Sequence, residues 1–264
     1  MQFPTGIGID RDGYIINQTS EDKISCVYKK LLEEILDILK KCIGDKLHSV
    51  YIYGSVGRGE AVLGSSDIDL SVILTSPLTT LESTILTKQT TDFICSKAII
   101  PKVDYDIEIL DEVCKDKNLY YWGFWLKHIC TCIYGENLSI RFRKMKPNIN
   151  ICKSLNEDLI DTLNSYRKSI VEEDFDSNTS LSVLKRIVRG AYCLVSVRDN
   201  SWSINIQENL AIIKHYFPGE EFFGKVEQAF LNKESISHRE VLYYIDYFTI
   251  WFKNNTKDNV LFLN

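Results

Sequence analysis

The sequence has no long apolar segment and no surplus of positive charge. Its longest apolar runs, such as Leu70 to Leu74 and Cys193 to Val197, fall far short of the roughly 20 residues of a membrane-spanning helix. Residues 1–4 are not followed by the basic and apolar regions of a secretory signal. The net charge is -5, so the chain lacks the excess of lysine and arginine with which proteins bind long nucleic acid. We therefore expect a cytoplasmic protein that uses neither a membrane nor long nucleic acid.

Paired cysteine motifs are absent as well, although the chain contains eight cysteines. No Cys-x-x-Cys pair and no His-x-x-x-His pair supplies the spacing of a zinc site. Most of the cysteines lie in stretches of apolar periodicity, and we interpret them as reduced core thiols. With 45% hydrophobic and 25% charged residues over 264 positions, the composition is that of an ordinary globular protein.

The first part of the chain mixes helical periodicity with short β-branched or alternating runs. The predicted helices lie at 21–43, 56–62 and 81–98. The predicted strands lie at 49–53, 68–74 and 102–110. Gly44 follows the first helix and is suited to end it. Gly54 follows the first strand and is suited to a turn.

Beyond about residue 112 the strand signals stop and helical periodicity continues to the end of the chain. The predicted helices lie at 117–133, 153–173, 179–198, 205–216, 220–232 and 236–254. The basic stretch from Arg141 to Lys146, which ends in Pro147, marks the expected domain boundary. The predicted class is α+β: a small mixed β-sheet with flanking helices in residues 1–145, followed by an all-helical bundle in residues 146–264.

Residues 53–74 carry most of the chemical information. They read Tyr-Gly-Ser-Val-Gly-Arg-Gly-Glu-Ala-Val-Leu-Gly-Ser-Ser-Asp-Ile-Asp-Leu-Ser-Val-Ile-Leu. Side chains alternate between the faces of a strand, so Asp67 and Asp69 point to the same side. Two like charges this close raise each other's proton affinity unless a cation lies between them. A hard divalent ion bound by oxygen ligands suits the pair.

The predicted strand at 102–110 offers a further carboxylate. Asp104, Asp106 and Glu108 alternate with apolar residues and therefore share its polar face. This face is either a solvated edge or, beside the strand that follows Asp67, the source of a third acid. Spacing alone does not choose among the three.

The Gly-Ser turn, the Asp-x-Asp pair and the later acidic strand together resemble the nucleotidyltransferase superfamily with the catalytic fold of DNA polymerase β. The extended motif, Gly-Ser-x-x-Arg-Gly-x-x-x-x-Gly-x-Ser-Asp-x-Asp-Leu, is similar to the bacterial branch that contains antibiotic nucleotidyltransferases. The resemblance implies that Asp67, Asp69 and a third acid are catalytic and hold Mg²⁺. Asp106, followed by apolar alternation, fits the family's usual pattern better than Asp104.

The same resemblance assigns the binding of phosphates. The Gly54-Ser55 turn would cradle them, because glycine permits close approach of the backbone. Arg58 and Ser66 are secondary candidates for phosphate contacts. In the helical half, Lys185 or Arg189 would reach the triphosphate, as a helix residue does in the antibiotic-modifying relatives. The alternative for these two is a solvated charged face.

The resemblance implies a Mg²⁺-dependent nucleotidyltransferase that transfers AMP from ATP to a hydroxyl of a small molecule. An aminoglycoside-like antibiotic is the leading acceptor. Two alternatives stay open: an adenylyltransferase of the toxin-antitoxin type that modifies a partner protein, and a nucleotide-binding module without turnover.

Overall fold

The computed structural model describes residues 1–97, 99–172, 177–232 and 236–257, and its contacts divide the chain into two compact units. Residues 16–144 form the sheet unit, and residues 1–15 with 145–264 form the helical unit. The sequence-based division assigns residues 1–15 to the sheet domain, whereas in the structure they pack on the helical unit. The buried carboxylate of Asp199 accepts hydrogen bonds there from the backbone N–H and the hydroxyl of Thr5.

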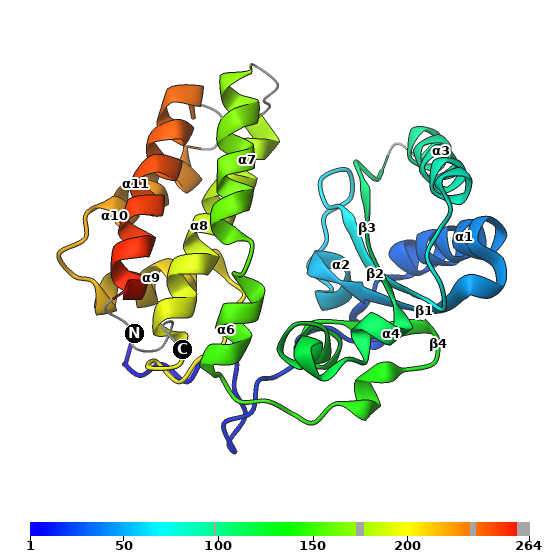
Figure 1. The fold of residues 1–264 in the computed structure, drawn as a ribbon, viewed down its shortest axis with the longest axis horizontal. Coiled ribbons are helices and arrows are strands. Elements are labelled where there is room, and N and C mark those ends of the chain that lie inside the picture. The colour runs from blue at the N-terminus through cyan, green and yellow to red at the C-terminus, as the bar shows by residue number, and fades with distance from the viewer. Residues whose placement is uncertain (98, 173–176, 233–235, 258–264) are drawn as a thin grey trace. The chain divides into compact units, whose positions relative to one another are not determined.

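The sheet unit contains a four-stranded mixed sheet in the order β3-β2-β1-β4 (Figure 1). Its strands are β1 (Leu47–Tyr53), β2 (Ile68–Leu74), β3 (Val103–Ile109) and β4 (Thr131–Gly135). β1 pairs antiparallel with β2 and β4, whereas β2 and β3 run parallel. The α+β class predicted from the sequence is confirmed.

The prediction that strand signals stop after residue 112 is wrong, because β4 follows. The single helix predicted at 117–133 is also replaced by several short elements. These are η3 (Asp116–Asn118), the π-helical turn η4 (Leu119–Gly123), α5 (Phe124–His128) and then β4. β4 contains β-branched and aromatic residues and pairs through backbone hydrogen bonds with the edge of β1 that β2 does not occupy. This tertiary pairing overrides the local helical periodicity.

Helices α1 (Cys26–Ile43) and α3 (Thr80–Ser96) cover one face of the sheet (Figure 1). α1 begins later than predicted because Ser20 caps a separate turn, η1 (Glu21–Lys23). α3 begins with a capping box in which Thr79 and Glu82 satisfy each other's backbone N–H groups. The shorter elements of the unit are η2 (Gly44–Lys46), α2 (Gly54–Arg58), α4 (Leu110–Val113) and η5 (Leu138–Arg141).

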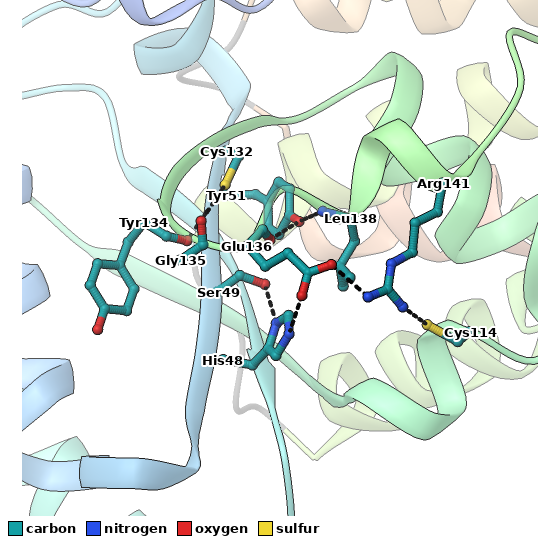
Figure 2. A network of polar contacts seen from close by, with 10 residues as sticks. All are labelled: His48, Ser49, Tyr51, Cys114, Cys132, Tyr134, Gly135, Glu136, Leu138 and Arg141. Carbon is teal, nitrogen blue, oxygen red and sulfur yellow. Dashed lines mark hydrogen bonds and ion pairs between the residues drawn. The ribbon is translucent and has the colours of Figure 1, made fainter.

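The segment after β4 is anchored to β1 by a polar network (Figure 2). The Tyr51 hydroxyl accepts a hydrogen bond from the Leu138 backbone N–H at 2.6 Å and donates to the Glu136 carbonyl at 3.1 Å. The Glu136 carboxylate lies 3.5 Å from His48 Nε2 and also binds the guanidinium of Arg141. Burial raises the pKa of Tyr51, so its phenol stays protonated and keeps its donor.

The helical unit contains six helices in its described residues. They are α6 (Ile149–Leu155), α7 (Leu159–Val171), α8 (Ser177–Ser196), α9 (Ile206–Tyr216), α10 (Phe222–Leu231) and α11 (His238–Lys257). The predicted helix at 153–173 is split, because α6 ends at Leu155 and its C-cap Asn156 donates through its side chain to the Cys152 carbonyl. No helix in the described ranges has both the length and the apolar character needed to cross a membrane.

Candidate active site

Two rows of side chains cross one face of the sheet at the end where β1 runs into α2. Tyr53 pairs with Asp69 across β1 and β2, and Asp69 pairs with Asp104 across β2 and β3. We call these three residues the end row. The second row consists of Tyr51, Ser71 and Asp106. Paired residues on neighbouring strands point to the same side of a sheet, so both rows face away from α1 and α3.

The end row concentrates negative charge. Burial raises the pKa of Asp69 to about 6, and the charges of Asp104 and Asp67 act in the same direction. Lys102 and Arg58 oppose this rise. The Lys102 ammonium lies 2.7 Å from a carboxylate oxygen of Asp104, which raises the pKa of Lys102. An ammonium thus partly neutralises the acids, a role that a bound cation could take over.

Gly54 lies directly against this row. Its φ of +69° falls in the left-handed region, and a Cβ added to it would collide with Oδ2 of Asp69. Only glycine therefore allows the turn after β1 to approach the acid so closely. Ser55 follows in α2 and is half-buried.

Of the two secondary phosphate candidates, Arg58 lies at the end of α2 and its charge reaches Asp69. The Ser66 hydroxyl accepts a hydrogen bond from the Val62 backbone N–H at 2.9 Å. Ser66 therefore stabilises the loop that leads into β2, next to Asp67.

Trp125 contacts both rows. Trp125 Nε1 donates to the hydroxyl of Ser71 at 3.1 Å, and its ring packs edge-on against Tyr53 at 5.1 Å. Burial raises the pKa of Asp106 to about 6, with Glu108 adding to the rise. The carboxylates that shift the pKa of Asp69 are Asp104 and Asp67, which favours Asp104 over Asp106 as the partner of the Asp-x-Asp pair.

The donor set suits a hard divalent cation. In the described part of the chain, no three His, Cys, Asp or Glu side chains are arranged as a metal site. Mg²⁺ commonly takes one or two carboxylates from a protein and completes its shell with water and substrate phosphates. Asp67 and Asp69 offer such a pair, and a cation beside them would relieve the repulsion that contributes to the raised pKa of Asp69.

Sequence reasoning missed two members of this site, Tyr53 and Lys102. The charges of Asp69, Asp106 and Asp104 add to burial in raising the pKa of Tyr53, so its hydroxyl stays a donor beside three acids. The available signals were the aromatic residue directly before Gly54 and the Lys-x-Asp spacing at 102–104. Lys185 and Arg189 are exposed on α8 of the helical unit, and their part in triphosphate binding stays a prediction.

Comparisons with known proteins bear on the domain and on the fold. Residues 32–120 match the model of a family described as the nucleotidyltransferase domain. The fold is similar to the crystal structure of the spectinomycin adenyltransferase AAD(9) from Enterococcus faecialis with ATP and spectinomycin, at 16% identity and a TM-score of 0.51. That match covers 85% of this chain and 99% of the other. No curated protein matches the chain. Residues 32–120 thus match a nucleotidyltransferase domain, and the fold of the chain is similar to that of the solved adenyltransferase.

Proposed function

We propose, with the nucleotidyltransferase domain as the premise, that the protein uses Mg²⁺ and ATP to transfer AMP to a hydroxyl of a small molecule. The end row beside the Gly54 turn carries the proposal. It places Asp69, Asp104 and the close-approach Gly54 at one end of one sheet face, and the charge of Asp67 acts on Asp69 there. Nucleotidyl transfer needs these groups, because the chemistry at phosphorus depends on positioning and charge neutralisation.

The residues would divide the work as follows. Asp67 and Asp69 would hold Mg²⁺, which when bound neutralises charge on the triphosphate during an in-line displacement. The Gly54-Ser55 turn would receive the phosphates, and Arg58 would add a positive charge beside them.

Asp104 would accept the proton of the acceptor hydroxyl. That hydroxyl oxygen forms a bond to the α-phosphorus, the bond between the α-phosphorus and the bridging oxygen breaks, and pyrophosphate leaves. The pairing of Asp104 with Asp69 supports this assignment. Asp106, one row further along the sheet, would support the second row instead.

An aminoglycoside-class antibiotic is the proposed acceptor. The support is the fold shared with the spectinomycin adenyltransferase, whose crystal contains ATP and spectinomycin. The test is incubation of the purified protein with α-labelled ATP, Mg²⁺ and an antibiotic panel that includes spectinomycin. We expect a labelled antibiotic and pyrophosphate. Absence of product from every antibiotic, with labelled protein in a lysate instead, would replace this acceptor with a protein.

The metal role is tested by Asp69→Asn. We expect the turnover rate to fall by about 10³-fold or more, because a neutral amide binds Mg²⁺ weakly. Asp92→Asn, at an exposed acid on α3, is the matched control. Turnover of Asp69→Asn within a factor of two of the wild type, at an unchanged Tm, would rule the metal role out.

A further inference from the structure

Arg58 is the positively charged residue of α2. It is the last residue of α2, four positions after Gly54, and its charge lowers the pKa of Asp69. Its Nε donates to Oε2 of Glu60 at 2.8 Å. The two side chains thus form an ion pair among the residues that the structure describes. Because a guanidinium carries five N–H groups, the bond at Nε leaves the four on its two terminal nitrogens for another acceptor.

Glu60 is itself held in place by the backbone. Its N–H donates to the Ser55 carbonyl at 2.9 Å, which ties it to the proposed phosphate turn. Gly59, between Arg58 and Glu60, is left-handed with φ +75°, and a Cβ there would lie 2.6 Å from the Lys23 carbonyl oxygen. The turn that brings the Glu60 carboxylate back to Arg58 therefore requires a glycine.

The ion pair between Arg58 and Glu60 is open to solvent. The side chains of Arg58 and Glu60 are 23% and 62% exposed. Ion pairs this open to water add little to folding stability, since solvent screens them and the side chains lose rotamer freedom. What the pair does change is the orientation of a long, flexible side chain. A fixed planar fork binds phosphate oxygens in pairs, which a freely rotating one does less well.

We propose that Glu60 is a positioning residue for nucleotide binding: by binding Nε of Arg58 it turns the terminal nitrogens toward the triphosphate. The inference rests on the proposed function and adds to it a residue that acts through Arg58. Glu60 does not touch the nucleotide in this assignment. Its carboxylate takes one edge of the guanidinium and leaves the opposite edge to the phosphates.

The test is a cycle of variants measured by calorimetry with Mg²⁺-ATP at about 0.15 M salt. Glu60→Gln should weaken binding roughly 2- to 10-fold, the range expected when a long side chain must be immobilised on binding. KM for ATP should rise by a similar factor while kcat holds. Glu60→Asp should recover part of the loss. In an Arg58→Lys background, Glu60→Gln should weaken binding no further, because lysine keeps the charge but has no planar fork.

Glu34→Gln is the matched control, since Glu34 forms an exposed ion pair of the same kind with Lys97 at 2.7 Å on the α1–α3 side. It should leave affinity and KM unchanged. Equal or tighter binding by Glu60→Gln in both backgrounds would overturn the inference, since only removal of a negative charge near the phosphates would then be acting. Failure of the wild-type protein to bind Mg²⁺-ATP would count against the proposed function instead.

Discussion

The two faces of the sheet differ in what they bury. Toward α1 and α3, β1 and β2 contribute Val50, Ile52, Leu70 and Val72, all with 0% exposure. Toward the other side they contribute Tyr53, Asp69 and Ser71, next to the acids of β3. Burial of the first face is favourable by about 25 cal/mol per Å² of apolar surface. Burial of the second face raises the pKa of Asp69 and Asp106 to about 6 each, because the ionised form of these carboxyl groups is less stable in the folded state than in water.

The same strands place apolar side chains on one face and acidic ones on the other by alternation alone. Neighbouring residues such as Asp69 and Leu70 differ in environment because their side chains point to opposite faces. Variants on one face should therefore change activity with little loss of stability, and variants on the other should do the reverse.

The sharpest way to probe the polar face is to compare its two rows. Asp104→Asn should lower kcat by about 10²- to 10³-fold, because Asp104 pairs with Asp69 and would accept the acceptor's proton. Asp106→Asn should lower it by less than about 10-fold, the effect of a positioning change. Both are read from initial rates at saturating ATP and acceptor. A larger loss for Asp106→Asn would reverse the assignment of the third acid.

The apolar face should respond in stability alone. Leu70→Ala leaves a cavity under α1 and α3 and should lower the free energy of unfolding by about 2–5 kcal/mol. The measurement is urea denaturation followed by circular dichroism, with kcat taken at a temperature where the variant is folded. A kcat reduced 10-fold or more in the folded variant would show that the two faces are not separable.

The sequence predicted the apolar face well and the polar face only in part. Helical and alternating periodicities report burial directly, so β1, β2, β3 and α3 lie close to their predicted ranges. The choice between Asp104 and Asp106 depends on the register of β3 against β2. Both acids lie on the same face of the strand, so periodicity cannot distinguish them.

Two parts of the fold escaped prediction because long-range contacts define them. β4 is five residues long, shorter than a window in which helix and strand periods separate, and forms by pairing with β1. Residues 1–15 join the helical unit through contacts such as Thr5 with Asp199, 194 positions away. Local pattern carries no information about such a partner.

A comparison of two glycines tests whether activity depends on the close approach of Gly54 to Asp69. Gly54 and Gly64 both have positive φ, +69° and +77°, so alanine at either adds a similar strain of about 1 kcal/mol. The space around Gly64 is open, whereas a Cβ on Gly54 would displace Asp69. Gly54→Ala should therefore lower kcat at least 10-fold more than Gly64→Ala, with Tm values that differ less. Equal activities would mean that Asp69 moves aside without consequence.

The smallest expected effect is a pH dependence of stability that arises on the polar face. Asp69 and Asp106 have a pKa of about 6 when folded, above the ordinary value of 3.8. Between about pH 4 and pH 6 the folded state therefore holds protons that the unfolded state has lost. The free energy of unfolding should fall across this window as pH rises. Urea midpoints without divalent ions measure this slope, and Asp69→Asn should reduce it by about half, whereas Leu70→Ala should keep it.

Because a cation beside Asp69 would lower its folded pKa, millimolar Mg²⁺ should also flatten the slope in the wild type. A slope that Mg²⁺ leaves unchanged would separate the raised pKa of Asp69 from metal binding.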